Sequence, residues 1–192
     1  MSELILQPTA TAQWQALVHD ALTSCGGSMH QDLESYLVMM LKRFSKRPEI
    51  VSSVMALEFL QGVEASGGVR HDLLRDLGDK CLIFSGFFPD RAQRKRVPVS
   101  YFAKVGQGAY AYLAVHAHES TSFTELFTAL QEHFVYLMDI IYCIRELRGN
   151  ADALTLEQAE ELWSVMGSRH ALKVIRRYSN GFVARDRSGF VH

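Results

Sequence analysis

Histidine and acidic residues that have metal-binding chemistry come close together at two places in the sequence. His116, His118 and Glu119 form one group, and Glu132 adjoins His133. Residues three apart on a helix share a face, so His116 and Glu119 are a candidate ligand pair. The chain lacks the Glu-x-x-His and His-Glu-x-x-His spacings of helical metal centres. We therefore expect structural or surface histidines, and we predict no metal and no cofactor.

One acidic residue, Asp139, interrupts the strongly apolar run from Phe134 to Ile144. A carboxylate in such surroundings needs a partner or has a raised pKa, and perturbed carboxylates also mark active sites. Structural ion pairs perturb pKa values as well, and no nucleophile or base companion can be identified. We therefore favour a salt bridge or a solvent-facing edge of the helix for Asp139, and we assign no catalytic residue.

Two other patterns have the letters of cofactor sites without the necessary context. The segment from Gly106 to Ala111 matches G-x-G-x-x-A, but the dinucleotide fingerprint requires a preceding strand, and here a helix start precedes it. We expect these small residues to pack against another helix. His19 is similar in position to the axial ligand of haem-oxygenase-like bundles, but the glycine-rich distal helix is missing, so we predict no haem. No nucleophile elbow, phosphate-binding loop, kinase or deaminase signature supports an enzyme.

Basic residues gather within 42–47, 91–96 and 169–187. The first cluster ends a helix, where the helix dipole favours cations, so it needs no functional explanation. The second lies in a segment bracketed by two prolines, Pro89 and Pro98. A short helix beginning at Pro89 would bring the basic residues that follow onto one face of a rigid base. The candidate partner-binding residues of the second and third clusters are Arg91, Arg94, Lys95, Arg96, Arg176 and Arg177.

Composition limits the class of protein. The chain has 192 residues, 48% of them hydrophobic, which is enough to build a substantial core. Twenty basic residues against 21 acidic ones give a formal charge of −1, so the total charge does not indicate wholesale nucleic-acid binding.

Cysteine usage and hydropathy indicate a compartment. Cys25, Cys81 and Cys143 are odd in number, far apart and in no C-x-x-C pair, which argues against a disulfide framework and a structural zinc site. The first residues do not resemble a signal peptide. The apolar run from Phe134 to Ile144 is much shorter than the roughly 20 residues that span a bilayer. We therefore expect a soluble cytoplasmic protein with no membrane partner.

The spacing of apolar residues is three and four almost throughout, which predicts an all-α fold. We expect a single-domain bundle, residues 1–181, of about eight helices packed around a long central helix at about 123–148. We expect the tail, residues 182–192, to be mobile, since it has no helical pattern. The expected helices lie at about 10–24, 30–46, 49–65, 70–87, 101–118, 123–148, 156–166 and 169–179.

The centre of the chain resembles uncharacterised all-helical proteins of Gram-negative bacteria. The similarity rests on Ser85-Gly-Phe-Phe-Pro-Asp-Arg91, Ser100-Tyr-Phe102 and Gly106-x-x-Ala-Tyr110, and it covers about residues 80–114. The resemblance implies no activity, cofactor or substrate.

The leading functional hypothesis is a non-enzymatic interaction or regulatory protein. It would dock an acidic protein partner through the basic segment 89–97 and the basic C-terminal tail. One alternative is nucleic-acid binding, against which the chain has no helix-turn-helix spacing, RNP-like motif or overall basic charge. Another is an enzyme or small-molecule binder with a pocket beside the helix at 101–118. The sequence leaves the partner and the oligomeric state open.

Overall fold

The computed structural model describes residues 9–45, 55–94, 96–116, 121–149 and 154–186, and these form ten α-helices without a strand. The predicted all-α fold is therefore confirmed. The helices are α1 (Ala10–Cys25), α2 (Gln31–Phe44), α3 (Met55–Glu64), α4 (Gly67–Phe87), α5 (Pro89–Arg94), α6 (Val99–His116), α7 (Thr121–Glu132), α8 (Phe134–Leu147), α9 (Leu156–Met166) and α10 (Arg169–Asp186).

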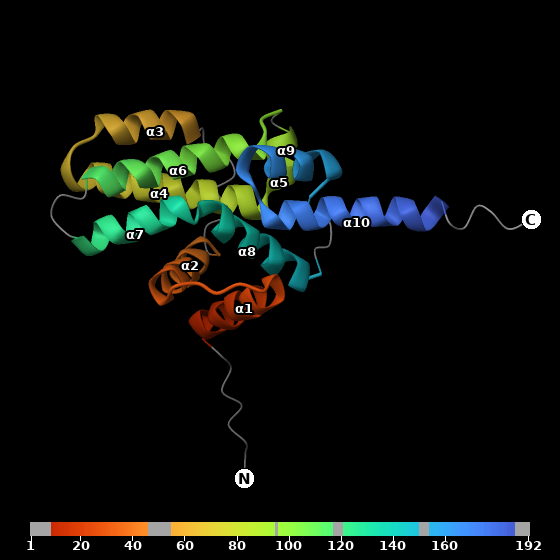
Figure 1. Ribbon diagram of the computed structural model, residues 1–192. Coiled ribbons are helices and arrows are strands. Elements are labelled where there is room, and N and C mark those ends of the chain that lie inside the picture. Colours follow the sequence, from red (N-terminus) through yellow and green to blue (C-terminus); the bar gives the residue numbers. More distant parts are fainter. Residues whose placement is uncertain (1–8, 46–54, 95, 117–120, 150–153, 187–192) are drawn as a thin grey trace, which may run out of the picture.

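The bundle is built around α4, α6 and α8 (Figure 1). Helix α4 packs against α3, α6 and α8, while α1 lies along α8, and α10 packs against α9 and α8. From Leu137 to Arg145 every residue of α8 is buried, so this helix is covered on all sides as its apolar sequence predicts. The buried apolar residues of all the helices except α3 form one hydrophobic cluster in the part of the chain described.

Close approach of helices explains the small residues of α6. A Cβ atom added to Gly106 would lie 2.6 Å from Cε2 of Phe134 and 2.7 Å from Cβ of Cys81. Such distances are far inside van der Waals contact. The Gly-x-Gly pattern therefore lies within a helix and packs against its neighbours, as predicted, and does not form a dinucleotide-binding turn.

The predicted central helix at 123–148 is wrong in one respect, because it is two helices. The chain leaves helical geometry at His133, whose φ is −95° and ψ is 10°. His133 N–H still donates to Ala129 O, and its carbonyl still accepts from Leu137 N–H, both at 2.9 Å. The break is thus confined to one residue, and the three-four spacing passes through it because α7 and α8 bury a continuous apolar stripe.

The C-terminal prediction also needs correction. Helix α10 continues to Asp186, so residues 182–186 are helical, and the expected domain boundary at 181 falls inside this helix. Gly181 lies within α10, where a glycine costs about 1 kcal/mol relative to alanine but does not end a helix by itself. Residues 187–192 lie outside the described part. The C-terminal half of α10 extends away from the other helices (Figure 1).

Candidate functional site

The basic segment is a short exposed helix and the turn after it. Arg91 and Arg94 on α5 and Arg96 just beyond it are all exposed, whereas Lys95 lies outside the described residues. The Arg91 guanidinium lies 5.1 Å from the ring centroid of Phe88. Within the described ranges none of these three arginines forms an ion pair.

Several contacts fix the base of this segment. Pro89 is buried, and its carbonyl accepts a hydrogen bond of 3.2 Å from Gln158 Nε2 of α9. Ala92 is fully buried, and its carbonyl accepts a hydrogen bond of 3.2 Å from Val97 N–H. The Asp90 carboxylate lies 3.9 Å from the Arg145 guanidinium of α8. Helix α5 is therefore attached to α8 and α9 by its inner side while its arginines face outward.

The second predicted basic region lies on α10. Arg176 and Arg177 are both exposed, and Arg177 Nη1 lies 2.9 Å from Glu146 Oε1 of α8. Glu146 directly follows Arg145, the residue that contacts α5. Two consecutive residues at the C-terminal end of α8 thus hold α5 on one side and α10 on the other.

A cavity of about 350 Å³ lies between the start of α6 and α9. Its lining residues are Arg96, Val97, Pro98, Val99, Glu157, Gln158 and Glu161. The two glutamates give this side of the segment an acidic wall, so Arg96 differs from Arg91 and Arg94 in its electrostatic surroundings. The cavity adjoins the N-terminal end of α6, whereas the space beside Gly106 is filled by Phe134 and Cys81.

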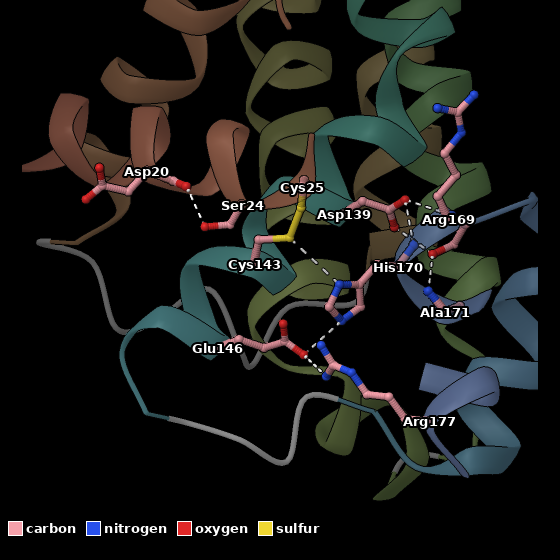
Figure 2. The surroundings of a disulfide bond; sticks show 11 residues. Asp20, Ser24, Cys25, Asp139, Cys143, Glu146, Arg169, His170, Ala171 and Arg177 are labelled. Atoms are coloured by element: carbon pink, nitrogen blue, oxygen red, sulfur yellow. Dashed lines mark hydrogen bonds and ion pairs between the residues drawn. A yellow bond between two sulfur atoms is a disulfide. The ribbon is translucent and has the colours of Figure 1, made fainter. Parts of the chain in front are cut away.

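Cysteine number and spacing argue against a disulfide framework, but the structure contains one disulfide. Cys25 at the end of α1 and Cys143 in α8 form a disulfide across a sequence separation of 118 residues (Figure 2). The odd number of cysteines misled the prediction because Cys81, which is buried, lies outside the disulfide. Burial, and secondarily the Glu58 carboxylate, raises the pKa of the Cys81 thiol. Cysteine usage therefore does not support a reducing compartment.

His170 lies against this disulfide, and the sequence analysis missed it. Its Nδ1 is 3.8 Å from Cys143 Sγ, and its Nε2 is 3.6 Å from Glu146 Oε1 (Figure 2). The residue is 3% exposed. Burial lowers the pKa of His170 to about 4, with nearby cations acting in the same direction and Glu146 opposing them. The imidazole is therefore neutral at physiological pH.

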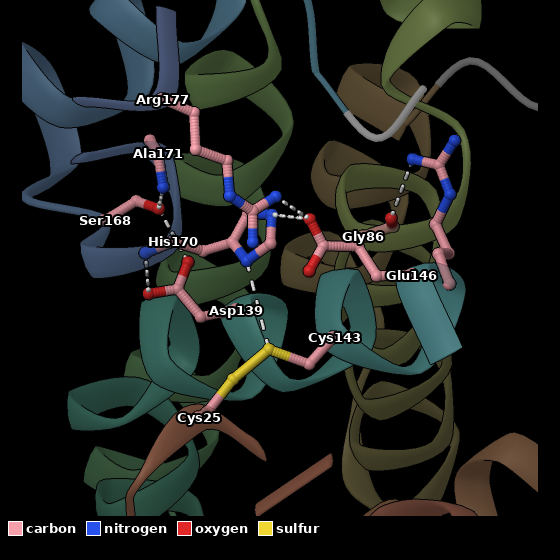
Figure 3. Close-up of polar contacts among 10 residues, drawn as sticks. Cys25, Gly86, Asp139, Cys143, Glu146, Ser168, His170, Ala171 and Arg177 are labelled. Atoms are coloured by element: carbon pink, nitrogen blue, oxygen red, sulfur yellow. Dashed lines mark hydrogen bonds and ion pairs between the residues drawn. A yellow bond between two sulfur atoms is a disulfide. The ribbon is translucent and has the colours of Figure 1, made fainter. Parts of the chain in front are cut away.

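Asp139 holds the N-terminal end of α10. Ser168 donates its hydroxyl proton to Oδ1 at 2.6 Å (Figure 3). The backbone N–H groups of Arg169 and His170 donate to Oδ2 at 2.9 and 3.2 Å (Figure 2). Burial raises the pKa of Asp139 to about 6, although these hydrogen bonds act in the opposite direction. The predicted salt bridge or solvent-facing edge is wrong, because the residue is 5% exposed and satisfies the unpaired donors at the start of a helix.

A second buried carboxylate, Asp79 of α4, was not identified from the sequence. Its Oδ1 accepts hydrogen bonds from the hydroxyls of Tyr36 at 2.7 Å and Tyr110 at 2.5 Å, and its Oδ2 is paired with Arg43. Burial raises the pKa of Asp79, while these partners lower it. The four side chains come from α2, α4 and α6, so the cluster ties three helices together.

The candidate metal-binding histidines lie only partly within the described residues. His116 is exposed and stacks on Tyr112 with ring centroids 3.9 Å apart, while His118 and Glu119 lie outside the described residues. His19 and His133 are exposed. In the described part of the chain, no group of three or more possible ligands could hold a metal ion. Over the same residues, no helix has the length and hydropathy required to cross a membrane.

Comparisons with protein families, with curated proteins and with solved structures return no match. The resemblance to uncharacterised helical proteins of Gram-negative bacteria therefore stays a prediction.

Proposed function

We propose that this chain is a non-enzymatic interaction protein that docks an acidic protein partner through α5 and α10. The observation that carries the proposal is the fixed attachment of α5, in which Pro89 and Ala92 are buried while Arg91 and Arg94 are exposed. Charges on a rigid support lose little conformational freedom on binding, so electrostatic attraction is offset less by the cost of ordering.

Helix α10 extends the positive region. Arg176 is exposed, and Arg177 is held at the end of α8 beside the attachment of α5. A partner that contacts α5 would meet α10 at the same end of α8. Positive charge on two helices that meet at one end of a third favours an acidic surface over a neutral one.

The acidic wall of the neighbouring cavity restricts where the partner contacts the segment. Arg96 shares this cavity with Glu157 and Glu161. An acidic partner would be repelled there, so we assign first contact to Arg91 and Arg94. Arg96 and Arg177 would contribute less, because each already lies near carboxylates.

The test is a double charge reversal, Arg91→Glu with Arg94→Glu. The matched control is Lys104→Glu with Arg148→Glu, which makes the same change in charge at exposed residues of α6 and beyond α8. Exposed charges contribute roughly 0–1 kcal/mol each, so both proteins should fold. Binding to polyglutamate, used as an acidic probe, should fall at least about tenfold in the first variant and much less in the control.

Salt and nucleic acid distinguish the alternatives. Binding to polyglutamate should weaken with salt, because exposed charges are screened within about 10 Å at 0.1 M. The nucleic-acid alternative requires tighter binding to duplex or single-stranded DNA than to polyglutamate, with a steep loss of affinity as salt rises. Equal losses in the double reversal and in its control would overturn the assignment to α5.

A further inference from the structure

The two halves of the Cys25–Cys143 disulfide differ in access. Cys25 is the last residue of α1, is half-buried and precedes the exposed Gly26, whereas Cys143 is 5% exposed within α8. In thiol–disulfide exchange a thiolate attacks one sulfur, and access helps to decide which sulfur it attacks. An incoming thiolate therefore reaches the sulfur of Cys25, and Cys143 is the leaving group.

His170 suits a reduced Cys143 better than the disulfide. The Glu146 carboxylate beside Nε2 favours the tautomer with its proton on Nε2, which leaves Nδ1 as an acceptor directed at Cys143 Sγ. A disulfide sulfur has no proton to donate to this buried nitrogen. The thiol of a reduced Cys143 would supply that donor, and buried acceptors are normally paired.

We propose that Cys25 and Cys143 form a reversible thiol–disulfide exchange site whose substrate is a dithiol reductant. One thiolate of the reductant attacks Cys25 Sγ, the bond between the two protein sulfurs breaks, and its electron pair leaves on Cys143, which takes a proton from solvent. The second thiol of the reductant loses its proton and attacks the reductant's own sulfur in the mixed disulfide. Cys25 then leaves as a thiolate and is protonated. The chain gains two thiols, and the dithiol becomes a disulfide.

The position of Cys143 explains why a dithiol is required. After attack by a monothiol, Cys143 stays in α8 beside the mixed disulfide on Cys25, with Nδ1 of His170 ready to accept its proton. Cys143 then attacks Cys25 and expels the monothiol, which restores the original disulfide. A dithiol avoids this reversal because its second thiol completes the reduction within the same complex.

The third cysteine serves as an internal control. Cys81 is fully buried in α4, and burial raises the pKa of its thiol, which disfavours the reactive thiolate. An alkylating reagent applied to the folded chain should therefore label the accessible Cys25, and only after reduction. Cys81 should be labelled only after unfolding.

The first experiment treats the oxidised full chain with dithiothreitol at pH 7, in buffer and in urea, followed by N-ethylmaleimide and mass spectrometry. Reduction of the folded chain at a rate within about tenfold of the unfolded chain, with Cys81 unlabelled, is the expected result. A disulfide that survives in buffer and reacts only in urea is a structural staple, and this outcome would overturn the proposal.

The second experiment measures reoxidation of the reduced chain by oxidised glutathione. In the wild type, the mixed disulfide on Cys25 should be resolved before it accumulates, whereas in Cys143→Ser it should persist. His170→Gln should slow the resolution about tenfold at pH 7, because no ring nitrogen then accepts the proton of Cys143 as its sulfur attacks Cys25. An unchanged rate of resolution would remove His170 from the proposal.

A surface variant keeps this test decisive if the buried His170→Gln chain fails to fold. Glu146 and Arg145 on α8, and Lys173 and Arg177 on α10, are the charged groups around His170. Glu146→Gln removes the carboxylate that opposes these three cations and favours the Nε2 proton. Glu146→Gln should also slow the resolution, by a smaller factor than His170→Gln does. Faster or unchanged resolution in Glu146→Gln would contradict the assigned roles of both residues.

Discussion

Asp79 and Asp139 are two buried carboxylates in the same bundle, and their hydrogen-bond donors differ in kind. Asp79 receives two tyrosine hydroxyls and an arginine from side chains of other helices. Asp139 receives one serine hydroxyl and two backbone N–H groups from the start of α10. Burial raises the pKa of both carboxyls. The first arrangement fixes three helices to one another, and the second fixes where one helix begins, next to the disulfide.

The difference has consequences for stability. A carboxylate paired with side chains leaves those partners unsatisfied when it is removed, and one of them is a charge. Breaking a buried ion pair by removing one member is generally far more costly than losing a hydrogen bond at a helix end. The cluster around Asp79 is therefore expected to contribute more to the stability of the core than the cap at Asp139.

The largest predicted effect is that of Asp79→Ala. It leaves Arg43 and two tyrosine hydroxyls without their acceptor, and we expect a loss of about 3–5 kcal/mol in the free energy of unfolding. Asp76→Ala is the matched control, because Asp76 lies on the same helix and forms a partly exposed ion pair of 3.0 Å with Lys80. The control should cost at most about 1 kcal/mol, measured by urea denaturation. Similar losses in the two variants would contradict the special role of the Asp79 cluster.

The second prediction concerns pH and the opposing behaviour of Asp139 and His170. The pKa of Asp139 is raised from 3.8 to about 6 on folding, so its contribution to stability falls as pH rises through this interval. The pKa of His170 is lowered from 6.5 to about 4, so its contribution rises with pH over almost the same interval. Each amounts to roughly 3 kcal/mol, and the two nearly cancel.

Single variants should separate these contributions. Asp139→Asn leaves the His170 contribution, so its stability should increase from pH 4 to pH 6.5 relative to the wild type. His170→Gln leaves that of Asp139, so its stability should decrease from pH 4 to pH 6. Urea midpoints at several pH values measure the slopes, and the shared contribution of Asp79 cancels in the differences. Parallel curves for the three proteins would show that neither group titrates as described.

Local patterns in the sequence predict much of this framework. Pro89 begins α5 as expected, and the Thr155–Gln158 capping box at the start of α9 has both of its hydrogen bonds. The apolar run at 134–144 correctly predicts a helix that is covered on all sides. These features depend on residues within one or two turns of each other, so the sequence contains the information directly.

The contacts that build the candidate sites join residues far apart in the chain. The donors to Asp79 lie 43, 36 and 31 residues away, and the disulfide spans 118 residues. Periodicity does not reveal which helices meet, so these pairings could not be predicted from spacing. The break at His133 was also hidden, since the same apolar spacing continues on both sides. Asp139 stands out in the sequence because its surroundings are apolar. Its hydrogen-bond donors, Ser168 and the two residues that follow it, can be identified only from the fold.

The smallest predicted effect links the Asp139 region to the surface of α10. Arg177 lowers the pKa of His170 through its charge and also forms an ion pair with Glu146, whose carboxylate raises it. Removing the guanidinium in Arg177→Ala takes away the repulsion and leaves Glu146 to act on the imidazole alone. The pKa of His170 should therefore rise above about 4, while stability changes by at most about 1 kcal/mol because the pair is exposed.

Arg176→Ala is the control for this variant, because Arg176 is the exposed neighbour on α10 and is not among the groups that shift the pKa of His170. The measurement is the titration of the His170 ring followed by NMR. A shift in Arg177→Ala alone would show that charge on α10 reaches the imidazole beside the disulfide. An acidic partner that neutralises Arg177 would then act on the same imidazole. Equal titration curves in both variants would mean that the buried region and the basic surface are electrostatically independent.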